Sequence, residues 1–574
     1  MNFKAIITIF IALNLLLGKF PDAIGYNGVV VSSNEYASRI GLEILKKGGN
    51  AIDAAIAVSF ALAVVHPGAG NIGGGGFMVV RTKDGEVNTI DFRETAPSKA
   101  FKNMFLDDSL NVIPGKSWST ALASGVPGSV AGMWLAHQKY GTSSWQDLLR
   151  PSILLAQYGF ELDPLNSSYL NSEKYKTFLS NDEEAKRIFT KDGDYKVGEL
   201  FIQTDLANTL RRIAFSGKEG FYNGETAKNI IKCMTRTGGI ISLEDLSNYE
   251  AKERKPIIFK YKDHTIYSMP PPSSGGVALA GILNQLENID FSQTPYHSAD
   301  YIHYLVEAER NVYADRATFL GDSDFNDIPI NNLISDVYSQ QRWLEVDLKN
   351  ARPSSSVSHG NLSELTNYVE PEETTHYSIV DKWGNAVSVT TTINGWFGNG
   401  IVVDESGFLL NNEMDDFSSK PGVPNKYGLI GNEFNSIEPN KRMLSSMSPT
   451  IVENPEGKLF LILGSPGGST IITTVAQIIL NIIEYGMNIK DAVEQPRFHH
   501  QWLPDFVYFE PFGFSVETLN ALEKRGHTTT FRRSIGEANC IKIDYLGDLD
   551  QVNYRNSIYS GAADSRRGAS AVGY

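Results

Sequence analysis

The pattern of hydrophobic and polar residues changes abruptly at Thr374. Upstream, residues 350–373 are polar, rich in serine and poor in apolar side chains, which is typical of a loop. Downstream, residues 375–380 are β-formers, 381–385 carry a turn sequence, and 386–394 form a second β-forming run. The pattern predicts a β-hairpin with a threonine at its first position.

Side-chain alternation decides which residues of this hairpin face each other. A turn centred on Trp383 puts Thr374 opposite Thr392, and Asn394 shares their face because strand side chains repeat every two residues. A shift of one residue in the pairing would separate them. Taken alone, the pattern favours an ordinary edge hairpin with polar residues at its end, since such hairpins are common.

Other elements follow from the same periodicities. Strands are expected at 28–32, 77–81, 89–92, 257–261, 265–269 and 459–463. Helices are expected at 35–47, 51–65, 130–140, 299–316 and 471–485. The segment 420–440 is rich in Pro, Gly and Asn, which predicts a mobile lid.

Two glycine-rich runs connect such elements. The run at 66–76 lacks a Gly-Lys-Ser/Thr ending and Rossmann spacing, so it predicts tight backbone packing rather than a phosphate loop. The run Gly464-Ser465-Pro466-Gly467-Gly468-Ser469 lies between a buried strand and an apolar helix. A strand, a glycine turn and a helix start bring free backbone N–H groups together, which suits an anion or an oxyanion.

Composition narrows the class of protein. The chain has 574 residues, 42% hydrophobic and 20% charged, which is typical of a globular protein. Its net charge of −15 argues against nucleic acid and anionic membrane surfaces as partners. Cys233 and Cys540 are too far apart for a CxxC motif; they either pair or, as we expect, remain buried free thiols.

The N-terminus predicts export. After a positively charged start, residues 5–17 are almost wholly apolar, a run shorter than the roughly 20 residues that span a bilayer. Ala23 and Gly25 are small residues suited to cleavage. We expect a signal peptide at 1–25 and a periplasmic or secreted protein without stable membrane insertion. The alternative is an uncleaved anchor.

Several familiar catalytic motifs are absent, namely Gly-x-Ser-x-Gly, His-Glu-x-x-His and Walker A. His499 and His500 are adjacent and would point apart, and the acidic run at 413–416 lacks EF-hand spacing, so no metal is expected. A threonine at a new N-terminus needs no histidine. Its own α-amine, with an unperturbed pKa of about 7.7–8.0, can act as the base.

Five motifs together resemble the γ-glutamyltranspeptidases, members of the N-terminal-nucleophile hydrolase superfamily, and in particular their secreted bacterial branch. They are Thr374-Thr375-His376-Tyr377-Ser378, Leu409-Leu410-Asn411-Asn412-Glu413-Met414-Asp415-Asp416-Phe417, Pro439-Asn440-Lys441-Arg442, Leu444-Ser445-Ser446-Met447-Ser448-Pro449 and Gly464-Ser465-Pro466-Gly467-Gly468-Ser469. The resemblance runs from about Gly28 to Tyr574. It favours a catalytic hairpin over an ordinary edge hairpin.

The resemblance implies roles for the catalytic residues. Thr374 is expected to be the nucleophile, both for self-cleavage and for attack on a γ-glutamyl carbonyl, with Thr392 bonding to its hydroxyl. The backbone N–H groups of Gly467 and Gly468 are expected to form an oxyanion hole, in which one donor contributes about 3 kcal/mol.

The resemblance also implies how the γ-glutamyl head, with one carboxylate and one ammonium, is recognised. The carboxylate is expected to meet a cation and two hydroxyls, from Arg93, Ser445 and Ser446. The ammonium is expected to meet an amide and two acids, from Asn394, Glu413 and Asp416. Tyr427 resembles the lid tyrosine of bacterial members. Some relatives have an amide at position 413, which leaves the acceptor preference open.

The fold implied is one four-layer αββα sandwich of mixed α/β (α+β) class. Residues 26–373 are expected to form a large subunit and 374–574 a small subunit, a heterodimer made by autoproteolysis between Glu373 and Thr374. The reaction implied moves a γ-glutamyl group from glutathione or a related amide to water, amino acids or peptides, and no cofactor is implied.

Two alternatives remain. A related acylase would cut glutaryl or cephalosporin-type amides on the same fold and would need no ammonium site. A secreted binding protein that has lost catalysis would remain a single chain.

Overall fold

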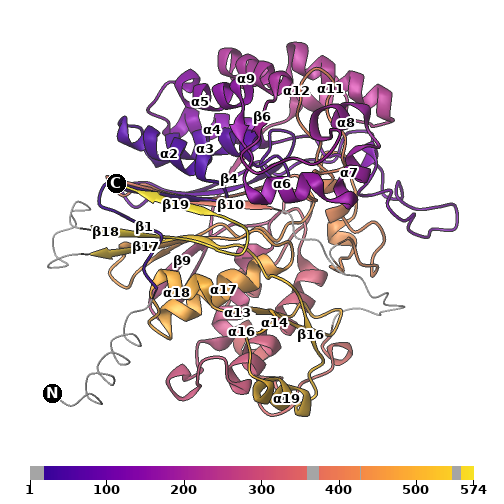
Figure 1. The fold of residues 1–574 in the computed structure, drawn as a ribbon. Helices are drawn as coiled ribbons and strands as arrows, with labels where there is room; N and C mark the ends of the chain where they lie inside the picture. Colours follow the sequence, from indigo (N-terminus) through magenta and orange to yellow (C-terminus); the bar gives the residue numbers. More distant parts are fainter. Residues whose placement is uncertain (1–18, 359–373, 427, 546–556) are drawn as a thin grey trace.

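Two stacked β-sheets form the centre of the molecule, and helices cover the outer face of each (Figure 1). The computed structural model describes residues 19–358, 374–426, 428–545 and 557–574. Each sheet has seven strands, and every neighbouring pair within them is antiparallel. The expected αββα sandwich is confirmed.

Both sheets take strands from either side of residue 374. The first sheet has the order β1 (Ala23–Gly25), β18 (Ser557–Ala563), β17 (Asn539–Tyr545), β13 (Leu459–Leu463), β12 (Thr450–Glu453), β9 (His264–Ser268) and β8 (Ile257–Tyr261). The second has the order β19 (Ser570–Gly573), β2 (Gly28–Ser32), β10 (Thr375–Asp381), β11 (Ala386–Thr392), β3 (Gly75–Arg81), β4 (Val87–Asp91) and β7 (Lys252–Arg254). The segments before and after residue 374 therefore form one folded unit.

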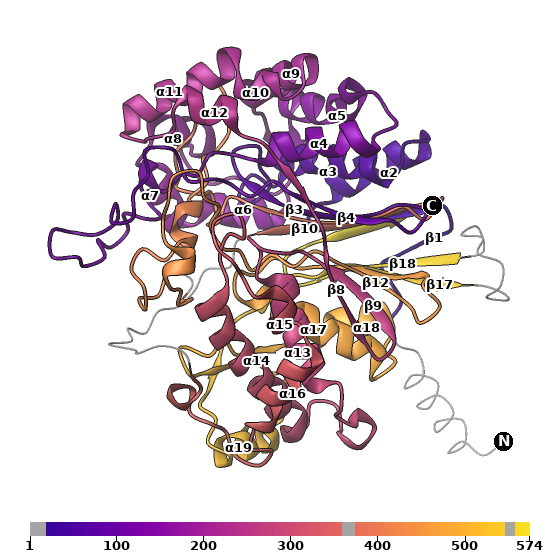
Figure 2. The same ribbon diagram turned by 180° about the vertical axis from the view of Figure 1, so that it is seen from behind.

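Two helical layers enclose the sheets, as the rear view also shows (Figure 2). The layer on the second sheet comprises α2 (Glu35–Lys46), α3 (Ala51–Val65), α4 (Ser129–Tyr140), α5 (Trp145–Tyr158), α6 (Pro164–Asn171), α7 (Glu173–Leu179), α8 (Glu183–Phe189), α9 (Thr204–Ser216), α10 (Glu219–Tyr222), α11 (Gly224–Thr237) and α12 (Leu243–Asn248). The layer on the first sheet comprises α13 (Gly275–Leu286), α14 (Ala299–Phe319), α15 (Ile330–Leu333), α16 (Asp336–Leu344), α17 (Thr470–Ile483), α18 (Ile489–Glu494) and α19 (Val516–Lys524).

The hairpin of β10 and β11 lies in the middle of the second sheet rather than at an edge. Its register pairs Thr375 with Thr391, which confirms the predicted alignment. The turn is fixed by Asp381, whose Oδ1 accepts hydrogen bonds from the N–H groups of Trp383 at 2.8 Å and Asn385 at 3.0 Å. Its Oδ2 accepts the N–H of Ala51 at the start of α3, which joins the turn to the helical layer.

The glycine run at 66–76 serves close packing, as predicted. A Cβ atom on Gly74 would lie 2.0 Å from the carbonyl oxygen of Thr392, and one on Gly75 would lie 2.5 Å from Oε2 of Glu94. Cys233 and Cys540 are buried free thiols, as expected, and burial raises the pKa of each to about 12.

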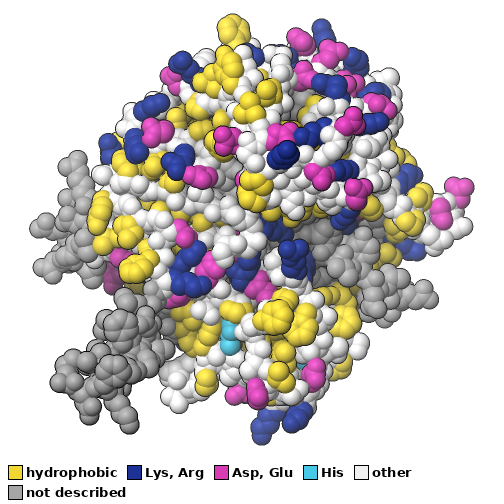
Figure 3. Space-filling model, viewed as in Figure 1, with side chains coloured by type: hydrophobic (Ala, Val, Ile, Leu, Met, Phe, Trp, Pro, Cys, Tyr) yellow, Lys and Arg dark blue, Asp and Glu magenta, His cyan; other side chains and the backbone are white. Residues whose placement is uncertain are grey.

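No helix in the described part of the chain is long and apolar enough to cross a membrane. On the face drawn in Figure 3, acidic and basic side chains are interspersed rather than segregated. The excess negative charge of the chain is therefore not gathered into one acidic area on that face.

Candidate active site

Thr374 lies immediately before β10, on the side of the second sheet that faces the first sheet. Tyr377 and Ile379 pack into the helical layer, whereas Val380 packs between the sheets, and Thr374 shares the face of Val380 because strand side chains alternate. Thr374 is buried, with 6% of its surface exposed. Thr392, at the end of β11, lines the same cavity, and its Oγ1 accepts the N–H of Asn394 at 2.7 Å.

A buried polar ladder continues from Thr374 along the hairpin. His376 Nδ1 lies 2.9 Å from Thr390 Oγ1, and its Nε2 lies 3.1 Å from Ser378 Oγ. Burial lowers the pKa of His376 to about 3, so the ring is neutral. A Cβ on Gly464 would lie 2.3 Å from the ring, so this histidine supports the start of the glycine turn rather than the chemistry.

The glycine turn between β13 and α17 faces Thr374 across the sandwich. Gly467 has φ +137° and Gly468 has φ +54°, and both values favour glycine. Thr470 closes the turn, because its N–H and its hydroxyl both donate to the carbonyl oxygen of Gly467, at 3.0 and 2.8 Å. The turn thus opens the N-terminus of α17 toward the cavity, as the sequence predicted.

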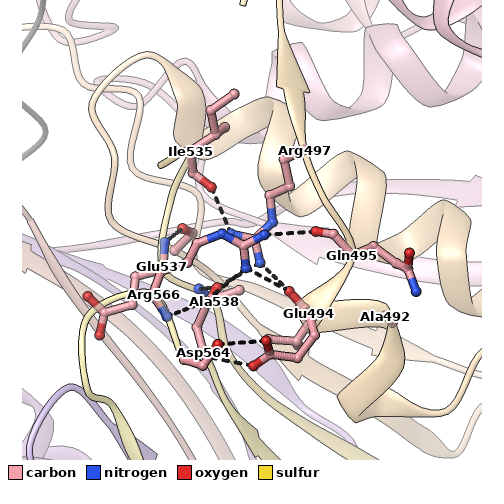
Figure 4. Close-up of polar contacts among 12 residues, drawn as sticks. Ala492, Glu494, Gln495, Arg497, Ile535, Glu537, Ala538, Asp564 and Arg566 are labelled. Carbon is pink, nitrogen blue, oxygen red and sulfur yellow. Dashed lines mark hydrogen bonds and ion pairs between the residues drawn. The ribbon is translucent and has the colours of Figure 1, made fainter. Parts of the chain in front are cut away.

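A second loop supports the glycine turn from behind. Gly536 lies against Gly467, where an added Cβ would be 3.3 Å from the Gly536 Cα, and the N–H of Glu537 donates to Ser465 Oγ at 2.9 Å. Arg497 holds this loop, donating to the carbonyl oxygen of Ile535 at 2.7 Å (Figure 4).

Arg497 belongs to a buried group of charges, here called the brace cluster, which consists of Arg497, Glu510, Asp564 and Arg566. Arg497 Nη2 donates to Asp564 Oδ2 at 2.7 Å (Figure 4). Arg566 donates to both carboxylate oxygens of Glu510, from Nε and from Nη2, at 2.6 Å each. The N–H of Ala538 also donates to Asp564 Oδ2 at 2.9 Å. Burial acts to raise the pKa of Asp564, but Arg497 and Arg566 hold it below its ordinary value.

One cavity, here called the donor cavity, brings most of the predicted site residues together. Its walls include nine of the residues expected from the sequence: Thr374, Thr392, Asn394, Gly468, Arg93, Glu413, Asp416, Ser445 and Ser446. Gly467 adjoins it through the glycine turn. Tyr427 lies outside the described residues, but Asn425 and residues 429–431 on either side of it line the cavity.

Arg93 is the centre of the donor-site cluster, which consists of Arg93, Glu94, Glu413 and Asp416. Arg93 Nη1 lies 2.6 Å from Glu413 Oε2 and 3.6 Å from Glu94 Oε2, and its Nη2 donates to Asp416. All four side chains are buried or nearly so. Apart from these ion pairs with Arg93, the oxygens of Glu94 and Glu413 have no hydrogen-bond donor of good geometry among the described residues.

The donor-site cluster contains three carboxyl groups and one guanidinium, and their pKa values reflect this excess of acidic groups. Burial acts to lower the pKa of Arg93, but Glu413 and Asp416 raise it above its ordinary value, so the guanidinium stays charged. Burial raises the pKa of Glu413 well above its ordinary value and also raises that of Asp416, against the opposing effect of Arg93. Burial raises the pKa of Glu94 to about 8. Three carboxyl groups thus surround Arg93, and Arg316 is a second cation that acts on Asp416.

Residues that the sequence analysis missed complete the wall. Arg316 of α14 donates from Nη2 to Ser446 Oγ at 3.3 Å and from Nε to Ser274 Oγ at 2.9 Å, so it orients one of the predicted carboxylate-binding hydroxyls. Asn435 donates to the carbonyl oxygen of Asp416 at 2.7 Å and accepts the N–H of Leu444 at 3.0 Å. The one signal for Arg316 was its place in an amphipathic helix, where an arginine usually faces solvent.

Asn394 has φ +67°, a conformation uncommon for a residue other than glycine. Its Nδ2 donates to the carbonyl oxygen of Asn412 at 2.9 Å, which ties the end of the hairpin to the acidic run that carries Glu413 and Asp416. The local strain therefore places an amide beside the two acids.

Within the described residues, His303, Glu307 and His527 are close enough to share a metal ion, but they lie outside the donor cavity. His303 Nδ1 and His527 Nε2 lie 2.8 Å apart and bond to each other, and Arg310 and Arg352 both pair with Glu307. These donors are already occupied, so we assign no metal to them.

A four-layer αββα sandwich with a threonine at the head of a central strand defines the class of N-terminal-nucleophile hydrolases. Within this class, residues 37–574 match the model of the family described as Gamma-glutamyltranspeptidase. The chain belongs to the γ-glutamyltranspeptidase family and is an enzyme that transfers or hydrolyses γ-glutamyl groups.

Individual relatives agree with this family. The glutathione hydrolase proenzyme of Escherichia coli (strain K12) is 48% identical over 523 residues, 91% of this chain and 89% of that protein. That of Bacillus subtilis (strain 168) is 38% identical and covers 96% of this chain and 92% of its own.

Solved structures agree on the fold. The γ-glutamyltranspeptidase of Helicobacter pylori is 44% identical with a TM-score of 0.57, covering 61% of this chain and 100% of that chain. The cephalosporin acylase of Bacillus halodurans has a TM-score of 0.80 at 25% identity, covering 97% of this chain and 98% of its own.

Proposed function

We propose that the enzyme cleaves the γ-glutamyl amide of glutathione and related compounds through an ester on Thr374. The observation that carries this proposal is the donor cavity, which places Thr374 beside Arg93, the serine pair at 445 and 446, and a set of carboxyl groups. The names of the proenzyme relatives support glutathione as a donor. Water, or the amine of an amino acid or peptide, then takes the γ-glutamyl group.

The γ-glutamyl head of the donor carries one carboxylate and one ammonium, and the donor-site cluster with its neighbours offers partners for both. The donor carboxylate binds the guanidinium of Arg93 and the hydroxyls of Ser445 and Ser446, because a guanidinium matches a carboxylate in two parallel hydrogen bonds. The donor ammonium binds Asn394, Glu413 and Asp416, because a cation beside the two carboxyl groups favours their ionised forms. An incoming zwitterion therefore supplies a cation to the acids and an anion to the arginine at once.

The chemistry begins at the N-terminus of Thr374. The neutral α-amine takes the proton of the Thr374 hydroxyl, and the oxygen attacks the γ-carbonyl carbon of the donor. The N–H groups of Gly467 and Gly468 stabilise the oxyanion. Return of the proton to the leaving nitrogen releases the amine and leaves the γ-glutamyl ester.

This mechanism requires a cut between Glu373 and Thr374, because an amide nitrogen is not a base. We propose that the chain cuts itself there into a fragment that ends at Glu373 and a fragment 374–574, and that the two stay together as a heterodimer because both sheets contain strands from each. We also propose export to the periplasm or the medium. Strand β1 pairs with β18, and Asp22 accepts a hydrogen bond from the N–H of Ala563. Because these residues belong to the folded unit, the contacts favour a mature chain that starts before residue 22 rather than at residue 26.

A denaturing gel and N-terminal sequencing test the proposal. We expect two fragments from the parent enzyme, the smaller one beginning Thr-Thr-His-Tyr. Thr374→Ala should remain one inactive chain. Thr374→Ser keeps the hydroxyl, loses the methyl group that restricts its rotamer, and should cut and retain some activity. Any other N-terminus, or activity in Thr374→Ala, would refute the scheme.

Assays with two anilides separate this function from that of an acylase. A γ-glutamyl anilide carries the ammonium that Asp416 and Glu413 bind, whereas a glutaryl anilide lacks it. We expect kcat/KM to favour the γ-glutamyl compound by at least about tenfold, the value of one charged hydrogen bond. A preference for the glutaryl anilide would favour the acylase.

A further inference from the structure

A segment just before α13 holds the backbone of the serine pair that lines the donor cavity. Ser273 forms a parallel β-bridge with Ser445, whose N–H donates to the carbonyl oxygen of Pro272 at 2.9 Å. Ser274 donates to the carbonyl oxygen of Ser445 twice, from its N–H and from its hydroxyl, at 2.7 Å each. Residues 272–274 do not line the donor cavity themselves, so they act on it through the serine pair.

Arg316 of α14 joins this segment to the donor cavity. It is buried, with 5% of its surface exposed, and it lines the cavity. Its Nε donates to Ser274 Oγ at 2.9 Å and its Nη2 donates to Ser446 Oγ at 3.3 Å. One guanidinium therefore holds the Ser446 hydroxyl directly and the backbone of Ser445 through Ser274.

The contacts of the serine pair leave both hydroxyls as hydrogen-bond donors. A guanidinium N–H can only donate, so Ser446 Oγ accepts from Arg316 and its own proton points away from that arginine. Ser445 Oγ accepts the N–H of Met447 at 3.1 Å. Within the described residues, neither hydroxyl donates a hydrogen bond to the protein. Each hydroxyl thus keeps one proton for a ligand in the cavity that Arg93 also lines.

We propose that Arg316 is a positioning residue that makes the enzyme selective for γ-glutamyl compounds with a free α-carboxylate, because it commits the hydroxyls of Ser445 and Ser446 to donate. The proposal rests on the carboxylate-binding roles proposed above. It adds a residue outside that set which decides what chemical group the serine pair accepts.

A carboxylate and a primary amide differ in what they offer to such hydroxyls. Both oxygens of a carboxylate accept, whereas the nitrogen of an amide can only donate. An amide nitrogen opposite a hydroxyl held as a donor leaves a buried N–H without an acceptor, which weakens binding. Without Arg316, the Ser446 hydroxyl can rotate and accept from the amide. Removal of Arg316 should therefore weaken binding of the acid and relax the rejection of the amide.

Arg316 also acts on the acid that we assign to the substrate ammonium. Burial raises the pKa of Asp416, and Arg316 acts together with Arg93 to lower it. A γ-glutamyl anilide and its α-carboxamide analogue both carry the ammonium, so this effect changes the binding of both in the same direction. The ratio of the two therefore reports on the carboxylate side of the site.

The test measures kcat/KM for these two compounds on the complete, self-cut enzyme. The parent should favour the free acid by about 100-fold, the loss of two charged hydrogen bonds, and Arg316→Met should reduce this ratio about tenfold, mainly by raising the KM of the acid. Arg316→Lys keeps the charge, but one nitrogen does not replace the fork of Nε and Nη2, so its ratio should resemble that of Arg316→Met. A parental ratio in both variants would overturn the proposal.

A double-mutant cycle shows whether Arg316 acts through the serine pair. Ser446→Ala should itself reduce the ratio about tenfold, and adding Arg316→Met should reduce it little further, because the arginine has lost the hydroxyl that it orients. Two losses that multiply independently would overturn the proposal. Ser274→Ala removes the other contact of Arg316 with a smaller change in volume, and it should lower the ratio about threefold. It provides the test if Arg316→Met does not fold, and an unchanged ratio there would count against the proposal.

Arg310→Lys is the matched control. Arg310 is a buried arginine of the same helix that pairs with Glu307 and Asp505 and does not line the donor cavity. It should leave the ratio at the parent level, whatever its melting temperature. A fall in the ratio equal to that of Arg316→Lys would mean that packing of α14 decides the selectivity, which would overturn the proposal. Failure of the proposed function is distinct, since the parent would then form no ester on Thr374 with either compound.

Discussion

The donor-site cluster and the brace cluster are both buried groups of arginine and carboxylate, yet their hydrogen bonding differs. In the brace cluster, Asp564 and Glu510 each accept from arginine and from backbone N–H groups. In the donor-site cluster, Glu94 and Glu413 form ion pairs with Arg93 but have no backbone N–H or other donor of good geometry among the described residues.

The pKa values differ in the same way. Two arginines hold the pKa of Asp564 below its ordinary value although burial acts to raise it, whereas burial raises those of Glu413, Asp416 and Glu94 although Arg93 acts to lower them. A saturated cluster of charges holds structure in place. An unsaturated cluster holds carboxyl groups with raised pKa values, which a substrate ammonium lowers because a nearby cation favours the ionised form.

Removal of an arginine from the brace cluster should give the largest effect. Arg497→Met leaves Asp564 without one partner and the Ile535 carbonyl without its donor, so the free energy of unfolding should fall by about 3–5 kcal/mol. The KM of the donor should change little, because Arg497 does not line the donor cavity. Denaturant unfolding and steady-state kinetics check both points. Asp564→Asn added to Arg497→Met should restore part of the loss. If Arg497→Met raised the donor KM and left the free energy of unfolding unchanged, the brace cluster would act in substrate binding as the donor-site cluster does.

Substitution of the donor-site arginine should affect catalysis instead. Arg93→Lys keeps the charge but cannot make two parallel hydrogen bonds to a carboxylate, so kcat/KM for a γ-glutamyl anilide should fall about 100-fold, or about 2.7 kcal/mol. Self-cleavage, followed on a gel, and the melting temperature should stay close to those of the parent. An unchanged KM would remove Arg93 from the donor site.

Loss of one acid should have a smaller and more selective effect. Asp416→Asn removes one of the charges that we assign to the donor ammonium, so the KM of a γ-glutamyl anilide should rise about tenfold. A glutaryl anilide has no ammonium and serves as the control, since its KM should not rise. An equal rise for both compounds would mean that Asp416 acts only by holding Arg93.

The smallest expected effect is a pH dependence at Glu94. Its pKa of about 8 in the folded enzyme lies above the ordinary value of 4.5, so Glu94→Gln should match the parent in donor KM near pH 7, where the carboxyl is protonated. Above pH 8 the ionised Glu94 of the parent competes for Arg93, and the parent KM should rise relative to the variant.

The same pKa difference predicts a trend in stability. Because the carboxyl pKa is raised on folding, the folded state binds more protons than the unfolded state. The contribution of Glu94 to the free energy of unfolding is therefore complete below about pH 4.5 and is lost as the pH rises toward 8. The unfolding free energy of the parent should therefore fall relative to Glu94→Gln across that window. If the unfolding free energies of the two proteins changed with pH in the same way, Glu94 would not be the group that titrates.

Local pattern was enough to predict the elements that carry the proposed nucleophile. The register of the hairpin followed from alternation and from a turn centred on Trp383, because each strand residue fixes the direction of the next. The glycine turn before α17 followed from a buried strand, two glycines and an apolar helix. Recognition of long family motifs extended this to Arg93, Asn394 and the acids, which lie in one cavity.

Tertiary structure alone decided which charges meet. Arg93 and Asp416 are 323 residues apart, and nothing in the periodicity of either segment indicates that they pair. The same holds for Arg316, which a helical pattern would place in solvent but which packs against Ser446, and for Arg497, which supports the glycine turn through a loop near residue 535. Local sequence determines how side chains are oriented within an element, whereas the packing of elements determines which of those side chains share a cavity and compete for one another's charge.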